Sequence, residues 1–252
     1  MRFQDFKVLS FDCYGTLIDW ESGLYAALAP LLAKTAKRFD RGQALQAFAE
    51  IESRQQAETP AMLYSHLLAV VYGALAQQWG ADVSEDECRR FGGSIPDWPA
   101  FPDSAEALSY LKKHHKLVIL SNVDRKSFAA SNKRLGVEFD AIYTAEDIGS
   151  YKPDPCNFAY MLSRLKEQGY DRSDILHVAQ SLFHDHGPAN AAGLTSVWID
   201  RRGDGAGWGA TMPPQGTPRY ALRFPSMADL VAAHRREMAG NGYGTFEDRP
   251  LS

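Results

Sequence analysis

The chain has few cysteines and no concentration of positive charge. Only three cysteines occur in 252 residues, without CxxC spacing, and an odd number cannot be fully paired within one chain. The 27 Lys and Arg residues are outnumbered by 31 Asp and Glu residues, which gives a formal net charge of −4, and the basic residues are scattered. These features argue against a disulfide scaffold and against a surface for nucleic acid or anionic membrane. A small soluble molecule is the expected partner.

Long apolar runs are also missing. No run approaches the ~20 residues needed to span a bilayer, and the N-terminus lacks the charged, apolar and small-residue sections of a signal peptide. Apolar residues still make up 45% of the chain, enough for a substantial core. We therefore expect a cytoplasmic protein with one large domain and a smaller insertion, because 252 residues exceed the usual size of one domain.

Short apolar runs alternate with helical patterns through most of the chain. This alternation predicts an α/β fold with a Rossmann-like, doubly wound parallel sheet. The predicted strands are 7–11, 116–120, 141–144, 175–178 and 195–199. The predicted helices around them are 104–115, 126–135, 157–168, 186–192 and 227–238.

The first two predicted strands are separated by about a hundred residues, too many for a single crossover. Helical patterns fill most of this interval, at 21–36, 41–56, 64–79 and 85–92. We therefore predict an inserted helical cap domain at 17–96 and a core domain made of 1–16 and 97–252. Within that core, 203–218 is rich in Gly and Pro and should be loop, and 239–252 should be frayed.

Polar residues follow four of the predicted strands. They are Asp12 after the first, Ser121 and Asn122 after the second, Lys152 in the loop after the third, and Asp185 after the fourth. Ligands of an open α/β sheet bind beyond the carboxyl ends of its strands. These side chains should therefore meet in one reaction centre.

Four segments in this order resemble the motifs of the haloacid dehalogenase superfamily. They are FDCYGTL at 11–17, LSN at 120–122, YKPD at 151–154 and SLFHD at 181–185. The Asp-x-Tyr-Gly-Thr form of the first motif resembles the type II, or L-2-haloacid dehalogenase, branch, to which azetidine-2-carboxylate hydrolases are similar. The resemblance implies a Rossmann-like core beneath a helical cap, and related dehalogenases commonly form homodimers.

Tyr14 separates this branch from phosphatases of the superfamily. Those enzymes usually carry Asp at this place as acid and base for the leaving alcohol, while the first Asp and the fourth motif help to hold Mg²⁺. Tyr14 can perform neither task. The resemblance therefore implies that no metal and no other cofactor is required.

The resemblance also implies a mechanism. Asp12 would attack the Cα of a small 2-substituted carboxylic acid, and water would then hydrolyse the resulting ester to give a 2-hydroxy acid. Lys152 would keep Asp12 ionised, and Thr16 and Ser121 would donate hydrogen bonds to Asp12 or to the substrate. Asp185 would position Lys152 or the hydrolytic water, or alternatively would cap the helix that follows it.

Further residues are candidates for binding the substrate. The backbone amides of Tyr14 and Asn122 can donate to Asp12 or to the substrate carboxylate. Trp20 and Phe183 could wall a small dry pocket between cap and core, the alternative being ordinary core positions. Arg54 is the candidate for the cap arginine that holds the leaving anion in this family, the alternative being an exposed helical arginine.

Some positions depart from the family pattern. Gln180 and Leu182 stand where type II dehalogenases usually have Ser and Asn, and Phe158 replaces an expected Tyr. His184 stands at an aromatic position near the halide. Its imidazole could exchange a proton near pH 7, which an amine leaving group needs and a halide does not; a packed histidine is the alternative.

The sequence leaves several functions open. Dehalogenation of an L-2-haloacid is the leading hypothesis, and hydrolytic ring opening of a strained cyclic 2-amino acid is the second. A Mg²⁺-dependent phosphatase would need its acid from elsewhere, such as His184 or Asp19. A binding protein without catalysis would retain the fold alone. Neither the leaving group nor the size of the acid follows from the sequence.

Overall fold

A six-stranded parallel sheet forms the centre of the computed structural model, which describes residues 1–203, 205 and 207–240. The strand order is β3-β2-β1-β4-β5-β6. Strands β1 to β5 are confirmed near their predicted positions, and β6 was not predicted because three residues form no recognisable pattern. The bounds are β1 Val8–Phe11, β2 Lys116–Ser121, β3 Ala141–Thr144, β4 Ile175–Ala179, β5 Thr195–Ile199 and β6 Leu222–Phe224.

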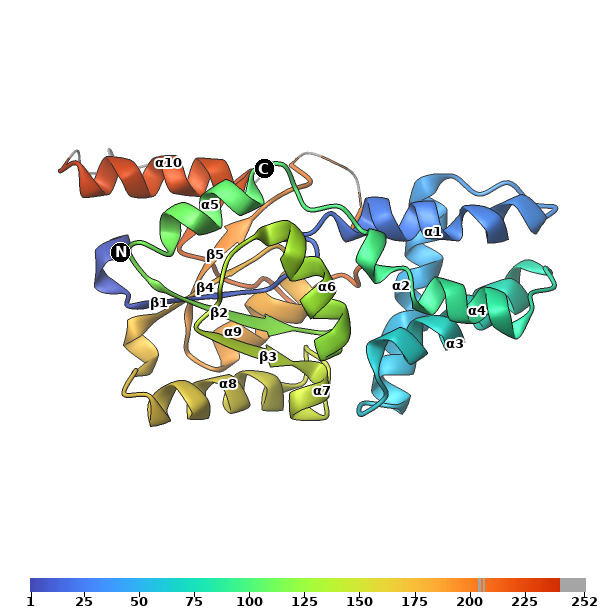
Figure 1. Ribbon diagram of the computed structural model, residues 1–252, viewed down its shortest axis with the longest axis horizontal. Coiled ribbons are helices and arrows are strands. Elements are labelled where there is room, and N and C mark those ends of the chain that lie inside the picture. The colour runs from blue at the N-terminus through green and yellow to red at the C-terminus, as the bar shows by residue number, and fades with distance from the viewer. Residues whose placement is uncertain (204, 206, 241–252) are drawn as a thin grey trace.

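Helices cover both faces of this sheet. In Figure 1, α5 and α10 lie together above it and α8 lies below it. Alternate residues of a strand point to opposite faces, and accordingly Leu9 packs in one hydrophobic cluster and Val8 in the other. The bounds are α5 Ser104–Leu111, α6 Arg125–Leu135, α7 Ala145–Ile148, α8 Pro155–Glu167, α9 Gly187–Ala191 and α10 Met227–Met238.

The chain after β4 differs from the prediction of a helix at 186–192. A π-helical turn, Leu182–His186, comes first and leads directly into α9. Its N-cap is Ser181, whose hydroxyl accepts a hydrogen bond from the His184 amide at 3.0 Å. The predicted frayed segment begins at Ala239 and lies mostly outside the described residues.

Four helices lie beside the sheet, at the right of Figure 1, beyond the carboxyl end of β1. They are α1 Trp20–Lys34, α2 Arg41–Glu58, α3 Tyr64–Trp79 and α4 Glu85–Gly92. Two chain connections join them to the core side by side, with Asp19 N donating to Pro99 O at 2.8 Å and Phe101 N to Leu17 O at 3.0 Å. This arrangement is the helical cap over the core; the domain limits at 16/17 and 96/97 stay a prediction.

Because Gly23 has no side chain, α1 can approach Trp98, in the second connection between cap and core, closely. A Cβ added there would lie 2.4 Å from the ring of Trp98. We expect Gly23→Ala to lower the free energy of unfolding by about 1–3 kcal/mol, because the buried indole must shift. Gly73→Ala in α3 is the matched control, since its Cβ would meet only Cys88 Sγ, at 3.7 Å. Urea unfolding measures both variants, and equal effects would contradict the expectation.

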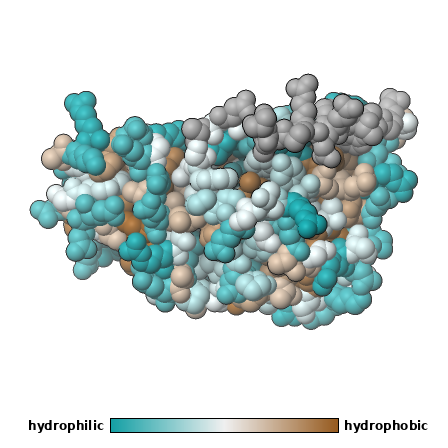
Figure 2. All heavy atoms as spheres, turned by 180° about the vertical axis from the view of Figure 1, so that it is seen from behind, coloured by the Kyte–Doolittle hydropathy of each residue, from teal (hydrophilic) through white to brown (hydrophobic). Residues whose placement is uncertain are grey.

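The outer surface is mixed in character. On the face seen in Figure 2, hydrophilic residues are spread widely and apolar residues show as separate spots. In the part of the chain that the structure describes, no helix combines the length and the apolar character needed to cross a membrane.

Candidate active site

Lys152 lies at the centre of the residues that were predicted to meet. Its Nζ donates to Asp12 Oδ1 at 2.9 Å, to Asp185 Oδ1 at 2.7 Å and to the Leu120 carbonyl at 2.9 Å. An ammonium has three N–H donors, so all of them are used. The side chain is 1% exposed. Lys152 is therefore a fixed positive charge that holds two carboxylates from different strand ends.

Asp12 is oriented from two sides. Its Oδ1 faces Lys152, and its Oδ2 accepts a hydrogen bond from Thr16 Oγ1 at 2.7 Å. Thr16 is held in turn by the Gln180 amide, which donates to its Oγ1 at 2.9 Å. Gly15, at φ 98°, lets the loop turn back so that Thr16 can reach Asp12. Burial raises the pKa of Asp12, and the Lys152 charge acts in the opposite direction.

Asp185 is supported by His177, which the sequence analysis did not identify. An ionised carboxylate only accepts hydrogen bonds, so His177 donates Nε2–H to Asp185 Oδ1 at 3.1 Å, and its Nδ1 lies 3.0 Å from Ser10 Oγ. Burial raises the pKa of Asp185, but Lys152 and His177 outweigh it and hold the pKa below its usual range. Asp185 lies inside the π-helical turn and does not cap it. The N-cap of this turn is Ser181.

The sequence contains a pattern that could have identified His177 as a functional residue. Ser10 and His177 are polar residues within otherwise apolar strands, and they are direct partners in the register of β1 and β4. Both are fully buried. A polar pair inside a parallel sheet needs a hydrogen-bonding partner, which here is Asp185.

A small cavity of about 40 Å³ lies over Asp12, between core and cap. This volume has room for roughly two or three water molecules. A substrate must therefore be very small or enter when the cap moves. The lining residues are Asp12, Tyr14, Trp20, Glu52, Gln56, Tyr64, Asn122, Val123, Lys152, Ser181, His184, Asp185 and Thr211.

Four of the predicted substrate-binding residues line this cavity: Tyr14, Trp20, Asn122 and His184. The Tyr14 hydroxyl, however, lies 2.8 Å from Ser131 Oγ, so Tyr14 contributes its ring to the wall. The side-chain amide of Asn122 is also engaged: it accepts from Lys152 N at 2.7 Å and donates to Lys152 O at 2.9 Å. Asn122 thus positions the Lys152 loop.

Arg54 is not brought to the site, so its assignment as the cap arginine is wrong. It is exposed on α2, whereas Glu52 and Gln56 of the same helix are buried and line the cavity. Residues four apart share one face of a helix, and a residue midway between them points elsewhere. Thr211, from the Gly- and Pro-rich loop, is a further lining residue that the sequence did not indicate.

Phe183 and Ser121 have other positions than expected. Phe183 is not among the residues that line the cavity; its ring packs edge-on against His184, with centroids 4.8 Å apart. The Ser121 hydroxyl is buried and has no hydrogen-bond partner among the described residues. It lies directly before the cavity-lining Asn122.

His184 does not provide a proton donor near neutral pH. Its ring borders the cavity but is enclosed by protein, and this burial lowers the pKa to about 4. His184 is thus neutral at pH 7, with Nδ1 3.2 Å from Ser181 Oγ. The expectation that its imidazole exchanges a proton near pH 7 is not supported.

Glu52 is a cavity residue whose pKa lies near neutral pH. Its side chain is 4% exposed, and Oε1 accepts a hydrogen bond from Tyr64 OH at 2.6 Å. Burial raises the pKa of Glu52 to about 7, although the hydrogen bond from Tyr64 acts against this.

The residues around Asp12 do not suit a magnesium ion. The ammonium of Lys152 lies between Asp12 and Asp185, which are the two carboxylates a metal would need. The hydroxyl of Tyr14 is directed to Ser131. Across residues 1–203, 205 and 207–240, no group of three or more His, Cys, Asp or Glu could hold a metal ion.

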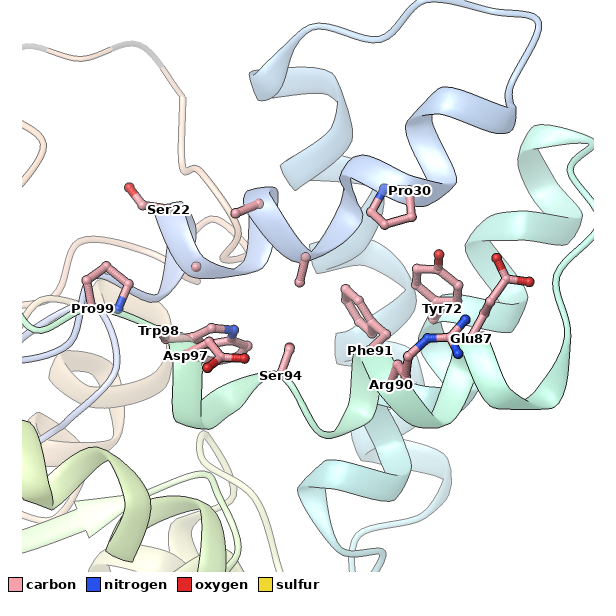
Figure 3. A pocket seen from close by; sticks show the side chains of 13 residues that line it. Ser22, Pro30, Tyr72, Glu87, Arg90, Phe91, Ser94, Asp97, Trp98 and Pro99 are labelled. Atoms are coloured by element: carbon pink, nitrogen blue, oxygen red, sulfur yellow. The ribbon is translucent and has the colours of Figure 1, made fainter.

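A larger cavity of about 530 Å³ lies within the cap (Figure 3). Helices α1 and α4 and the turn before Trp98 form its walls, and Tyr72, Arg90 and Phe91 are among the side chains that border it. It contains none of the residues bonded to Lys152. The chemistry expected from the sequence therefore belongs to the smaller cavity.

The comparison with protein families agrees with this arrangement. A model described as haloacid dehalogenase-like hydrolase matches residues 6–193, more than half of the chain. The chain belongs to this hydrolase family. It is 31% identical over 118 residues to (S)-2-haloacid dehalogenase 4A of Burkholderia cepacia, a match covering 46% of this chain and 49% of that protein. The hydrolase thus spans about half the length of this curated relative.

Solved structures confirm the fold of the hydrolase. The L-2-haloacid dehalogenase PA0810 is similar with a TM-score of 0.71 at 23% identity, covering 93% of this chain and 99% of that one. The L-2-haloacid dehalogenase of Xanthobacter autotrophicus, with chloropropionic acid covalently bound, has a TM-score of 0.72 at 19% identity, covering 91% and 98%. At these identities the likeness concerns the fold alone. The expected homodimer and cytoplasmic location stay predictions.

Proposed function

We propose that this hydrolase displaces a leaving group from the Cα of a small 2-substituted carboxylic acid, with Asp12 as nucleophile. The observation that carries this proposal is the saturation of Lys152 Nζ by Asp12, Asp185 and the Leu120 carbonyl. A fixed ammonium and the Thr16 hydroxyl hold one carboxylate, itself 6% exposed, at the floor of a small cavity. Such a carboxylate is a poorly solvated, oriented nucleophile.

The reaction proceeds in two steps. A carboxylate oxygen of Asp12 forms a bond to Cα while the leaving group departs with its electron pair. Water then attacks the ester carbonyl at Asp12, the C–O bond to the substrate breaks and restores the Asp12 carboxylate, and a 2-hydroxy acid of inverted configuration leaves. One proton of the water goes to the hydroxyl of the product and the other is released to solvent.

Isotope labelling tests this mechanism. With enzyme in excess in ¹⁸O-water, we expect the first turnover to place label in the Asp12 side chain and none in the hydroxyl of the product. This follows because water attacks the ester carbonyl, so the product hydroxyl oxygen comes from Asp12. The probes are (S)-2-chloropropionate and azetidine-2-carboxylate, followed by mass spectrometry of peptide and product.

Two controls sharpen this labelling experiment. Turnover in the presence of EDTA should equal turnover without it, since no step uses a metal. Label found directly in the product of the first turnover would contradict the ester mechanism, because water would then have attacked Cα itself.

A further inference from the structure

We propose that Arg201 is a positioning residue for the reaction: it fixes the loop that carries Asp12 and Thr16, and through this loop it keeps the nucleophile aligned. Arg201 lies two residues after the end of β5, a strand end at which the sequence analysis assigned no functional residue. The inference rests on the proposed function of Asp12 and adds a residue that acts on Asp12 from outside the cavity.

The guanidinium of Arg201 binds the backbone of this loop at Thr16. Its Nε donates to the Thr16 carbonyl at 3.2 Å, and its Nη2 donates to the same carbonyl at 2.9 Å. Among the described residues, no other group donates to this carbonyl. Two donors from one rigid, planar group fix both the distance and the direction of the carbonyl.

Thr16 connects this backbone contact to the nucleophile. Its carbonyl accepts from Arg201, and its side-chain Oγ1 donates to Asp12 Oδ2 at 2.7 Å. The loop is tight, because Leu17 N donates back to the Cys13 carbonyl at 2.7 Å. A displacement of the Thr16 carbonyl therefore also displaces the hydroxyl that orients Asp12.

Arg201 itself has a fixed position. Its Nη1 donates to Asp103 Oδ2 at 2.9 Å, and its guanidinium lies over the ring of Phe101, 4.1 Å from the centroid. The side chain is 10% exposed. Asp103 Oδ2 also accepts from Ala228 N, in the first turn of α10, at 3.1 Å. Arg201 thus joins the nucleophile loop to the segment before α5 and, through Asp103, to α10.

Arg201 acts on the nucleophile through position and not through charge. Its own charge is compensated by a carboxylate at 2.9 Å, and the charges that act most strongly on Asp12 are those of Lys152 and Asp185. Burial raises the pKa of Asp12, and the hydrogen bond from Thr16 acts against this. Misplacement of the Thr16 hydroxyl should therefore raise the pKa of Asp12 and leave less of the ionised nucleophile at a given pH.

A titration of Asp12 tests this role without depending on turnover. The aspartate carboxyl groups are labelled with ¹³C, the Asp12 signal is assigned with Asp12→Asn, and its pKa is measured by NMR in wild type, Arg201→Gln and Arg201→Lys. We expect a higher pKa of Asp12 in both variants, since lysine keeps the charge but lacks the planar fork that binds one carbonyl twice. An unchanged pKa in both variants, or full restoration by lysine, would overturn the positioning role.

Steady-state kinetics with (S)-2-chloropropionate and azetidine-2-carboxylate give a second readout. We expect both Arg201 variants to lose about 10- to 100-fold in kcat with little change in KM, because Arg201 is not among the residues that line the cavity. The acid limb of kcat/KM should move to higher pH. Arg134→Gln is the matched control: Arg134 Nη2 donates to the Pro96 carbonyl at 2.8 Å, outside the nucleophile loop, and its loss should change neither kcat nor the pH profile.

The outcomes separate this role from the proposed function. A raised pKa of Asp12 in the Arg201 variants, combined with no turnover of either probe by wild type, would contradict the proposed function and retain the positioning role. Turnover by wild type with an unchanged pKa of Asp12 in the variants would do the reverse.

A double variant covers the case in which Arg201→Gln fails to fold by circular dichroism. Thr16→Val is then compared with the double variant Thr16→Val and Arg201→Lys. Because Arg201 acts through Thr16 Oγ1, the second change should add nothing to the pKa of Asp12. A further rise would overturn the positioning role.

Discussion

Replacing Asp12 by Asn abolishes turnover, by at least about 10⁴-fold in kcat, if this side chain is the nucleophile. An amide has almost the same shape as the carboxylate but lacks its negative charge. The hydrogen bond from Thr16 to the side-chain oxygen can be kept, so the fold should survive. Initial rates of product formation measure the effect, and circular dichroism checks the fold.

Asp19→Asn is the matched control for this variant. Asp19 also follows the first strand, but its carboxylate caps α1 by accepting from Ser22 N at 3.2 Å, a role that Asn performs equally well. We expect near-normal activity, whereas a phosphatase that used Asp19 as its acid would be inactivated. More than a tenth of wild-type activity in Asp12→Asn would rule out Asp12 as nucleophile.

Replacing Lys152 by Met should affect both activity and stability strongly. The change leaves Asp12 and Asp185 buried without the ammonium that now binds both of them. Removing one partner of a buried ion pair costs about 3–5 kcal/mol, and we expect turnover to fall by about 10²- to 10⁴-fold as Asp12 loses its charge partner. Urea unfolding and initial rates measure the two effects.

The loss of stability in Lys152→Met should depend on pH, in a direction set by the two buried carboxyl groups. Without Lys152, burial and mutual repulsion raise the pKa values of Asp12 and Asp185 in the folded state above their unfolded values. The folded variant then binds more protons than the unfolded chain between those values, so its stability falls as pH rises. The deficit against wild type should therefore be smaller at pH 5 than at pH 8.

Lys166→Met controls for the loss of a lysine charge as such. Lys166 pairs with Asp171 at the surface, where both side chains are largely exposed. We expect no measurable change in its stability or activity. An equal loss in the two lysine variants, or a deficit in Lys152→Met that is independent of pH, would contradict the central role of Lys152.

The sequence alone determined the sheet, the presence of a helical insertion and the cluster of Asp12, Lys152 and Asp185. These features depend on local patterns: a short apolar run, a loop directly after it, and polar residues at the points where strands end. Because parallel strands place their carboxyl ends at one edge of a sheet, the order of the motifs was enough to bring Asp12, Lys152 and Asp185 together. The tertiary structure changed none of these three residues.

Only the tertiary structure decided which cap residues face Asp12 and which groups titrate near neutral pH. The docking face of α2 depends on long-range packing, and it brings in Glu52 where the sequence had suggested Arg54. Burial, which no local pattern encodes, lowers the pKa of His184 and raises that of Glu52. His177 likewise acquires its role through cross-strand register with Ser10. The proposed nucleophile thus follows from the sequence, whereas the lining of the cavity above it depends on how cap and core meet.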